Sequence, residues 1–547
     1  MLYPKVRSAS ETMIETMTEH SKSESAAAAP EESARNRTEV FAVHGADPEV
    51  LAYAMAKYSR SALSMKESLK EISSQRAEQF LNTFYFQYGH RSIADLAHIA
   101  FAVERLSLLA AIVLVDEQRW DGQERSTRYQ NFRKSGWYLP EFGAHSAERE
   151  RFVQTVESLF GEYHAISEKA FEFLQGQIAR PEGMKEDSYA RTLRARAFDV
   201  ARYLLPLATN TSLGQIVNAR TLEQQISRLL TDPHPEVREL GEQLRKAAAG
   251  AAWNVEGEQR DALQREIAAL DPALGARSEQ LLCRESKTAP TLVKYAAASE
   301  YARKTRRELA DAAASLMNHA AIAPPGTLPD GSTAVVDLLD DEPLEIEIAA
   351  TLLYGACHYP YRQIRDRVAA LDEARRSEII ALGARHRGRH DELLREFSSG
   401  HALRFDILMD IGGFRDMHRH RRCVQILQPF TNLHGYEIPA LVADAGLVDQ
   451  YRVAMNGAAA AFGALAAAGC DSQAAYALPL GVRNRALFKM DFAEALYIAE
   501  LRSGPAGHFS YRQVAWQMYR AVAKKHPSLA SYFRVTDIHT PVDLLQR

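Results

Sequence analysis

The sequence consists of two related halves, and this internal duplication limits the possible folds more than any other feature. Residues 201–207 read ARYLLPL, and residues 474–480 read AAYALPL. In each half a segment with an aromatic residue and a proline precedes this motif, and an Arg with a His six residues later follows it. The two pairs are Arg228 with His234 and Arg502 with His508. Because the order of the motifs is preserved, we predict two copies of one domain.

The duplication divides the 547 residues into five parts, as a chain too long for one core requires. Repeat 1 is expected over residues 38–244 and repeat 2 over residues 332–530. A helical connector over residues 245–331 joins them. Residues 1–37, rich in Ser, Glu, Ala and Thr, are expected to form a disordered tail. Residues 531–547 form a C-terminal extension.

The composition is that of an ordinary globular protein and excludes several classes of protein. Apolar residues make up 46% and charged residues 25% of the chain. A net charge of −4 argues against a nucleic-acid-binding surface over a whole domain. No apolar run reaches the roughly 20 residues of a membrane span. The four cysteines form no C-x-x-C pair, so we expect a cytoplasmic protein without disulfides or a structural zinc.

Apolar residues recur mostly at helical spacing, and only short segments alternate as strands do. Helices are predicted over residues 48–59, 150–175, 222–230, 259–270 and 454–467. Strands are predicted over residues 39–43, 98–103, 334–338 and 403–408. Few strands among many helices indicate an α+β fold that is predominantly helical, with a small antiparallel sheet in each repeat.

Basic residues gather in repeat 2 at residues 415–422, which read RDMHRHRR. With residues 411–422 as one helix, four of the side chains would share one face: Arg415, His418, Arg419 and Arg422. Repeat 1 carries QERSTRY at residues 123–129 instead. Guanidinium groups bind phosphate oxygens bidentately, and hydroxyls and backbone amides donate to the oxygens that remain. Together the two segments predict a site for a doubly anionic phosphate group.

These motifs resemble those of the flavin-dependent thymidylate synthase family. That family is marked by an Arg-His-Arg triplet followed by Asn-Glu and Ser-x-Arg-Tyr within one short segment. Repeat 2 has the triplet at residues 419–421 but Pro429 where the Ser is due. Repeat 1 has the Ser-x-Arg-Tyr at residues 126–129 but reads DEQ at residues 116–118, where the triplet is due. A Gly-His-x-Ser motif at residues 89–92 adds to the resemblance.

In that family the active site lies between subunits of a homotetramer, with FAD and dUMP stacked between the triplet of one subunit and the Ser-x-Arg of another. The resemblance therefore implies one composite site made from both repeats, and a homodimer of tandem chains. It implies catalytic roles for Arg419, Ser126 and Arg128. It implies nucleotide binding by Ser126, Thr127, Arg128 and Arg419, assisted by Arg228 or Arg502. It implies cofactor binding by Arg419, His420, Arg421, Gln123, Glu124, Asn218 and one of His234 and His508.

The implied reaction is the reductive methylation of dUMP to dTMP. Its cofactors would be FAD, NADPH as the reductant and methylenetetrahydrofolate as the one-carbon donor. The family uses no cysteine nucleophile, so the scattered cysteines are no objection. Catalysis would consist mainly of positioning and electrostatics, with the flavin carrying the redox step.

Several of these patterns also have simpler readings. The basic segment could be a solvated helix end, and residues 126–129 could be a surface turn. His234 and His508 could be interface histidines with satisfied hydrogen bonds, and Asn218 could cap a helix.

Two further patterns are read as structural. Residues 385–390 read RHRGRH, but they lack the spacing from a strand and favour a basic loop or a helix start over a zinc site. Cys357 beside His358 favours a buried thiol.

Two other functions stay open. A flavin- or nucleotide-binding homologue without turnover is favoured by the DEQ segment at residues 116–118, by Pro429 and by Asp416, which stands where the family usually has Gln. A nucleic-acid-associated protein would use the basic runs and lose affinity steeply with salt.

Overall fold

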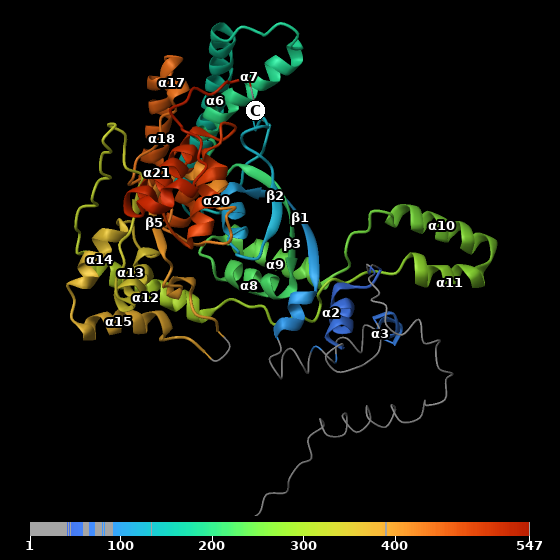
Figure 1. Cartoon of the computed structure of the whole chain (residues 1–547). Helices are drawn as coiled ribbons and strands as arrows, with labels where there is room; N and C mark the ends of the chain where they lie inside the picture. The colour runs from blue at the N-terminus through green and yellow to red at the C-terminus, as the bar shows by residue number, and fades with distance from the viewer. Residues whose placement is uncertain are drawn as a thin grey trace, which may run out of the picture. The chain divides into compact units, whose positions relative to one another are not determined.

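The computed structural model describes residues 41, 43, 45–57, 65–71, 79, 81, 91–132, 134–388 and 391–545. The predicted tail and most of the predicted strand at residues 39–43 lie outside them. The chain divides into two compact units, Met1–Ala46 and Asp47–Arg547. The described helices and strands all belong to the second unit (Figure 1).

Repeat 1 contains a three-stranded antiparallel sheet in the order β1-β3-β2. Its strands are β1 (His98–Ser107), β2 (Asp121–Glu124) and β3 (Asn210–Asn218). Its helices are α2 (Pro48–Lys57), α3 (Met65–Glu71), α5 (Leu108–Leu114), α6 (Ser146–Gln177), α7 (Glu186–Ala201), α8 (Ala219–Thr231) and α9 (Pro235–Ala249), with the 3-10 turns η3 (Arg91–Leu96) and η4 (Arg202–Leu204). The connector forms α10 (Gly257–Leu270), α11 (Pro272–Leu282) and α12 (Glu300–Met317).

Repeat 2 contains a four-stranded antiparallel sheet in the order β4-β5-β7-β6. Its strands are β4 (Val336–Leu338), β5 (Leu403–Asp410), β6 (Val424–Leu427) and β7 (Arg483–Met490). Its helices are α13 (Leu344–Tyr354), α14 (Tyr361–Ala369), α15 (Glu373–Ala384), α16 (Ile411–Met417), α17 (Ala440–Asp444), α18 (Val448–Ala467), α19 (Asp471–Ala474), α20 (Phe492–Ser503) and α21 (Phe509–Lys525), with the turns η5 (Arg395–Phe397), η6 (Ala475–Ala477) and η7 (Pro527–Tyr532). The order β5-β7-β6 matches β1-β3-β2 in repeat 1. The predicted α+β fold, predominantly helical with two small antiparallel sheets, is confirmed.

A polar residue stands at the end of each long strand and begins the helix that follows. The side chains of Ser107, Asn218, Asp410 and Asp491 accept hydrogen bonds from the first turns of α5, α8, α16 and α20. Such caps satisfy backbone N–H groups that have no partner within the helix. The strand–cap–helix unit therefore occurs twice in each repeat.

The two Leu-Pro-Leu motifs pair with each other. Pro206 lies opposite Pro479 in an antiparallel bridge. The amide of Leu207 donates to the carbonyl of Leu478 at 2.9 Å, and the amide of Leu480 donates to the carbonyl of Leu205 at 3.0 Å. The contact is reciprocal, as between two subunits related by a two-fold axis.

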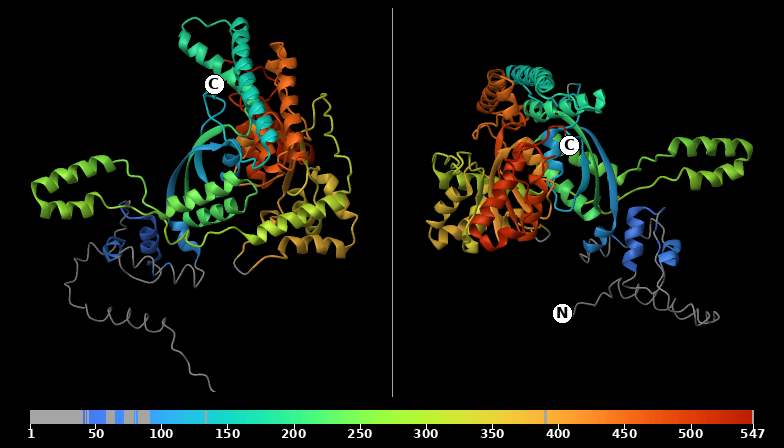
Figure 2. Two further views of the ribbon diagram at one scale, coloured as in Figure 1. Left: turned by 180° about the vertical axis from the view of Figure 1, so that it is seen from behind. Right: turned by 45° about the horizontal axis from the view of Figure 1, so that its top comes forward.

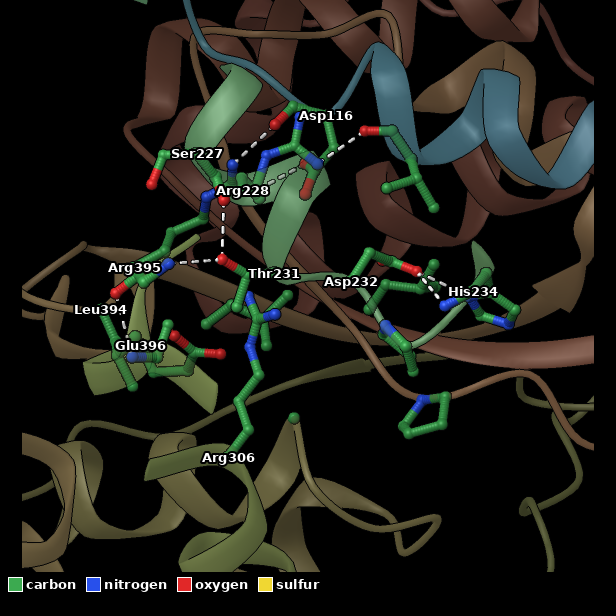
Figure 3. A pocket seen from close by; sticks show the side chains of 18 of the residues that line it. Asp116, Ser227, Arg228, Thr231, Asp232, His234, Arg306, Leu394, Arg395 and Glu396 are labelled. Carbon is green, nitrogen blue, oxygen red and sulfur yellow. Dashed lines mark hydrogen bonds and ion pairs between the residues drawn. The ribbon is translucent and has the colours of Figure 1, made fainter. Parts of the chain in front are cut away.

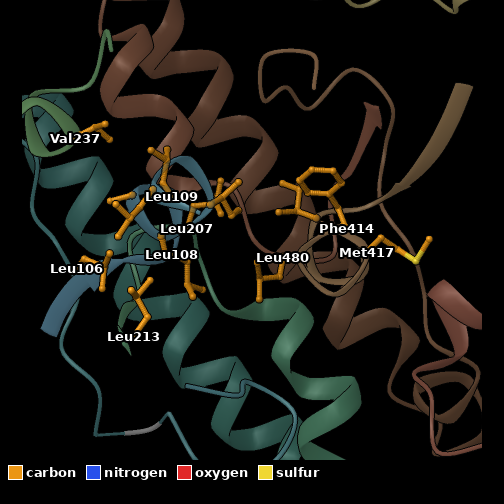
Figure 4. Packing of buried hydrophobic residues seen from close by; sticks show 14 of the residues in the cluster. Leu106, Leu108, Leu109, Leu207, Leu213, Val237, Phe414, Met417 and Leu480 are labelled. Atoms are coloured by element: carbon orange, nitrogen blue, oxygen red, sulfur yellow. The ribbon is translucent and has the colours of Figure 1, made fainter. Parts of the chain in front are cut away.

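One hydrophobic core extends through both repeats. Figure 4 shows Leu109 and Leu207 of repeat 1 in the same cluster as Phe414 and Leu480 of repeat 2. The long helices α6 and α18, one from each repeat, also pack side by side (Figure 2). A second core lies between the sheet of repeat 2 and helices α12 to α15. None of the described helices is long and apolar enough to cross a membrane.

Candidate active site

The basic segment of repeat 2 is a turn and not the continuous helix predicted over residues 411–422. Helix α16 ends at Met417, so Arg419 and Arg422 do not share its face. Gln425 on β6 determines the turn: its amide oxygen lies 2.8 Å from His418 Nδ1, and its Nε2 donates to the carbonyl of His420 at 2.7 Å. These bonds direct the chain back into the sheet.

Within one chain the turn of repeat 1 touches the basic segment of repeat 2. Arg415 donates to the carboxylate of Glu124, and its other terminal nitrogen lies 3.4 Å from the hydroxyl of Thr127. Arg202 lies 3.4 Å from both Thr127 Oγ1 and Asp416 Oδ2. The two segments singled out in the sequence therefore form one polar cluster.

Arg128 is buried at this cluster with its donors occupied. Its guanidinium binds Asp199 bidentately at 2.6 and 3.0 Å. It also donates to the hydroxyl of Tyr511 at 2.8 Å and to the carbonyl of Ala506 at 3.1 Å. Burial would raise the pKa of Asp199, but the hydrogen bond and charge of Arg128 hold it well below its ordinary value. Ser126 accepts from the Arg128 amide at 3.2 Å.

The triplet and Arg502 form the other side of the cluster. Arg502 Nε donates to His420 Nε2 at 2.8 Å, so the proton of a neutral His420 sits on Nδ1, 3.6 Å from Glu494. The guanidinium of Arg421 stacks on the ring of Trp120 at 4.3 Å. Arg419 is exposed. Burial would raise the pKa of Asp416, but the charges of Arg202 and Arg128, and then those of Arg419 and Arg502, lower it.

Several guanidinium N–H groups of this cluster lack an acceptor. Among the described residues, Nε of Arg202, Nε of Arg415 and Nε of Arg421 are buried without a hydrogen-bond partner. Unpaired buried donors of this kind are costly unless a ligand or water completes them. Three unused cationic donors beside an exposed Arg419 suit an anionic ligand rich in oxygen acceptors.

His508 stands at the start of α21 beneath the cluster. Its Nδ1 accepts from the Ser510 amide at 3.3 Å, and its Nε2 donates to the carbonyl of Asp199 at 3.1 Å. Its ring packs on Tyr203 at a centroid distance of 5.3 Å. Burial lowers the pKa of His508 to about 3, so the ring is neutral. It positions Asp199 and, through it, Arg128.

Three of the predicted site residues lie elsewhere. Arg228 donates to Glu117 at 2.9 Å and to the carbonyl of Val113 at 2.7 Å, and His234 Nδ1 lies 2.7 Å from Asp232. Both line a separate cavity of about 1820 Å³ (Figure 3). Asn218 accepts from Thr221 N at 2.8 Å and caps α8, as the simpler reading predicted.

The cavity occupies the position in the duplicated fold that corresponds to the cluster. Tyr203 of repeat 1 packs on His508 of repeat 2 in the cluster, and Tyr476 of repeat 2 packs on His234 of repeat 1 beside the cavity. Arg502 donates to His420 in the former, and Arg228 donates to Glu117 in the latter. The cluster and the cavity are therefore corresponding regions of the two repeats, with related contacts.

Two important residues of the cluster escaped the sequence analysis. Asp199 stands on α7 one turn before Arg202, and Tyr511 stands three residues after His508. Nothing in their local sequence marks them, because their partner Arg128 is distant in the chain.

The structure also describes most of the remaining sequence patterns. Gly89 and His90 of the Gly-His-x-Ser motif lie outside the described residues. Arg385 follows the last residue of α15, so the described part of the second basic run, residues 385–388, comes directly after a helix. Cys357 is buried, and burial raises the pKa of its thiol to about 11. No group of three or more metal-ligating side chains occurs in the part of the chain that the structure describes.

Comparison with known proteins matches both halves to the same family. The model of the family described as thymidylate synthase complementing protein matches residues 41–252 and again residues 335–528. The chain belongs to this family. It holds two copies of the thymidylate synthase complementing protein sequence, as the internal duplication predicted.

The similar proteins match either most of the chain or less than half of it. The UPF0159 protein of Chlamydia muridarum is 28% identical and covers 90% of both chains. The UPF0159 protein of Thermoplasma acidophilum is 25% identical over 88% of this chain and 94% of its own. The flavin-dependent thymidylate synthase of Clostridium tetani is 26% identical over 38% of this chain and 81% of its own. A crystal structure of flavin-dependent thymidylate synthase ThyX from Helicobacter pylori, complexed with FAD and dUMP, is 16% identical, covers 37% of this chain and 88% of that chain, and has a TM-score of 0.25.

Proposed function

We propose that the chain is a flavin-dependent thymidylate synthase that converts dUMP to dTMP at one composite site. Membership of the thymidylate synthase complementing protein family supports the reaction class, and the Clostridium tetani relative bears that name. The observation that carries the proposal is the contact of Glu124 and Thr127 with Arg415, which brings the turn of repeat 1 and the basic segment of repeat 2 into one cluster.

The chemistry of the cluster fits a nucleotide monophosphate. The phosphate of dUMP carries up to two negative charges and three terminal oxygens, and it would accept from the unused guanidinium groups. Arg419 is the most accessible of them and is assigned to the phosphate, with Ser126 and Arg502 beside it. Thr127 and Arg128 hold the shape of the turn, because their polar groups bind Arg202, Arg415, Asp199 and Tyr511.

The residues on the Trp120 side suit a flavin nucleotide. Arg421 has an unpaired Nε and lies over the indole of Trp120, so it offers a donor to an acceptor-rich ligand. We assign FAD to Arg421, His420, Gln123 and Glu124, with His508 positioning the pocket. When bound, FAD supplies the hydride chemistry, with NADPH as its reductant and methylenetetrahydrofolate as the one-carbon source. The chain's own residues would bind the substrate, orient it and neutralise its charge.

The proposed enzyme is a homodimer of tandem chains, since two such chains supply four family domains. We place it in the cytoplasm, where the four free thiols at Cys283, Cys357, Cys423 and Cys470 stay reduced. The residues that line the second cavity, Arg228 and His234, are not part of this composite site, so Arg502 and His508 take the two alternative roles.

The test uses the purified chain loaded with FAD. Reduced flavin should be reoxidised, and dTMP formed, only when dUMP and methylenetetrahydrofolate are present. Arg419→Ala and Ser126→Ala should each lower the affinity for dUMP by tenfold or more, because each removes a donor to a charged group. If both act at one site, the double variant should lose less than the product of the two effects.

Arg422→Ala is the matched control. Arg422 is the neighbouring exposed arginine, paired with Asp491 at 2.8 Å away from the cluster. An unchanged dUMP affinity in Arg419→Ala, or an equal loss in Arg422→Ala, would contradict the assignment.

A binding protein without turnover is the second candidate. It is favoured by the pairing already present in the cluster, where Asp199 occupies Arg128 and Asp416 faces Arg202. Tight dUMP binding without dUMP-dependent flavin reoxidation would select this candidate.

A further inference from the structure

The cavity lined by Arg228 and His234 corresponds in position to the cluster but differs from it in chemistry. It lies between the repeats and is lined by the loop after α5, by α8, by the start of α12, and by residues 391–398 and 424–433. Its volume of about 1820 Å³ is more than a small organic molecule needs. Figure 3 shows Asp116, Arg228, Arg306 and Arg395 around it.

The charge of this cavity is the reverse of the charge of the cluster. Asp116 and Glu117 stand where repeat 2 has Arg419 and His420. Eight acidic side chains line the cavity against five arginines. Asp116 pairs with Arg395 and Glu117 with Arg228. Arg119 and Arg220 both pair with Asp95, which is not among the lining residues, so four of the five arginines are already in ion pairs. A phosphate group would meet an excess of carboxylates here, and their charge disfavours a nucleotide ligand.

Two residues that line the cavity, His358 and Gln428, each hold a buried polar atom without a hydrogen-bond partner among the described residues. Gln428 is 1% exposed, and its Nε2 donates to the carbonyl of Tyr359 at 2.9 Å. Its Oε1, an acceptor, is buried without a partner among the described residues, and so is Nδ1 of His358. Burial lowers the pKa of His358, so its ring is neutral at pH 7 and one of its nitrogens can accept. The cluster has spare donors, whereas this cavity has a spare acceptor.

Aromatic side chains complete the wall. Tyr295, Phe397 and Phe430 line the cavity beside the polar groups. Aromatic faces bind organic cations and stack on flat heterocycles. Together with the acidic excess they favour a nitrogen-rich ligand over a carboxylic acid.

We propose that this cavity is a second ligand site that binds an organic amine, a molecule with amino N–H donors and no phosphate. Two sources share this chemistry: an aliphatic polyamine and an amino-substituted nucleoside. The inference does not depend on the proposed enzymatic activity, because it rests on the second cavity alone.

The experiment is calorimetric titration of the full chain with spermidine, cytidine and dUMP. Spermidine or cytidine should bind, and Gln428→Leu should weaken the binding about tenfold by removing the acceptor without changing the volume much. His358→Phe removes the other unpaired atom, Nδ1 of His358, and should also weaken amine binding. Ser126→Ala should leave amine binding unchanged, and dUMP binding should be unaffected by Gln428→Leu, so the two proposals fail separately.

A matched pair of exposed arginines on α12 tests the charge argument without risk to folding. Arg306 lines the cavity, and the neighbouring Arg307 does not. Arg306→Glu should strengthen spermidine binding about threefold to tenfold. Arg307→Glu should bind spermidine about as tightly as the unmodified chain does. Neither substitution should change the affinity for cytidine. Tighter spermidine binding in Arg306→Glu identifies a polyamine as the ligand. If this tightening is absent and His358→Phe weakens cytidine binding, the ligand is a nucleoside.

Three outcomes would overturn the proposal. They are the absence of binding by both amines at millimolar concentration, an equal strengthening of spermidine binding by Arg306→Glu and Arg307→Glu, and dUMP binding that Gln428→Leu or His358→Phe weakens.

Discussion

At the scale of single residues, the hydrogen bonds of His508 keep its ring in one protonation state. One ring nitrogen accepts from the Ser510 amide, and the other donates to the Asp199 carbonyl. Only the neutral tautomer with its proton on Nε2 can make both bonds. Protonation would put a second N–H against the Ser510 amide and a positive charge beside Arg128 and Arg202, which also lower its pKa.

We therefore predict that His508 makes folding sensitive to mild acid. The folded pKa is about 3 and the ordinary value is 6.5, so the unfolded chain binds a proton first as the pH falls. The stability from a neutral His508 is complete above pH 6.5 and is lost below it. The loss from this group should reach about 2 kcal/mol at pH 5.

Urea unfolding at pH 7 and at pH 5 measures this loss. His508→Asn keeps a capping side chain and should lose about 2 kcal/mol less between the two pH values than the unmodified chain. His145→Asn, an exposed position before α6, is the control and should unfold with the unmodified pH dependence. If the free energy of unfolding falls by the same amount between pH 7 and pH 5 in all three proteins, His508 does not cause the loss.

At the scale of elements, the two repeats hold the same strand–helix junction with exchanged partners. In repeat 1, Ser107 ends β1 and donates to Glu236 of α9 at 2.6 Å. In repeat 2, Asp410 ends β5 and accepts from Ser510 of α21. The hydroxyl and the carboxylate have changed places, but each junction keeps one donor and one acceptor. Gly413 leaves room there, since a Cβ on it would lie 2.8 Å from Ser510 Oγ.

This exchange predicts that a second substitution restores stability that the first one removes. Asp410→Ser should cost about 1–3 kcal/mol, because it removes the carboxylate that holds Gly413 N and Ser510. Ser510→Glu alone should also destabilise, because it brings two buried carboxylates together. The double variant carries the Ser and Glu pair of repeat 1 and should recover more than half of the summed loss. Unfolding midpoints in urea give the coupling, and simple additivity would contradict the equivalence of the junctions.

Elements were predictable from the sequence where one segment carried its own signal. Strand β1 showed alternation, α6 showed helical periodicity, and both lie close to where they were predicted. The end of α16 was not predictable, because Gln425 on another strand sets it and residues 418–422 have no helix-breaking residue. The same limit applies to the site. Arg419 and Ser126 stand in motifs, whereas Asp199 and Tyr511 are recognised only from their contact with Arg128 in the folded chain.

At the scale of the whole molecule, fusion of two family domains allows their two sites to differ. In a dimer of identical domains, a change in one site would appear in both. Here Arg419 and Asp116 occupy corresponding positions in one chain, and they give one site an excess of arginines and the other an excess of carboxylates. The reciprocal pairing of Leu207 with Leu478 and of Leu480 with Leu205 keeps both sites in register.

The same pairing predicts that the repeats fold only together. Leu205, Leu207, Leu478 and Leu480 are fully buried in a core that both repeats share, so each repeat alone would expose a large apolar surface. The connector is a suitable place to divide the chain, since α10 has no buried residue and α11 has only Gly275. Fragments 1–270 and 271–547, produced together, should co-elute as one complex, and each produced alone should aggregate.

Gel filtration and static light scattering of the co-produced fragments measure the association. Leu480→Asp in the second fragment places a charge at the centre of the pairing and should abolish co-elution. Leu281→Asp, on the exposed side of α11, is the matched control and should leave the complex intact. Two soluble, separately monomeric fragments would mean that the repeats are independent domains, and the composite site could not then be held together by the shared core.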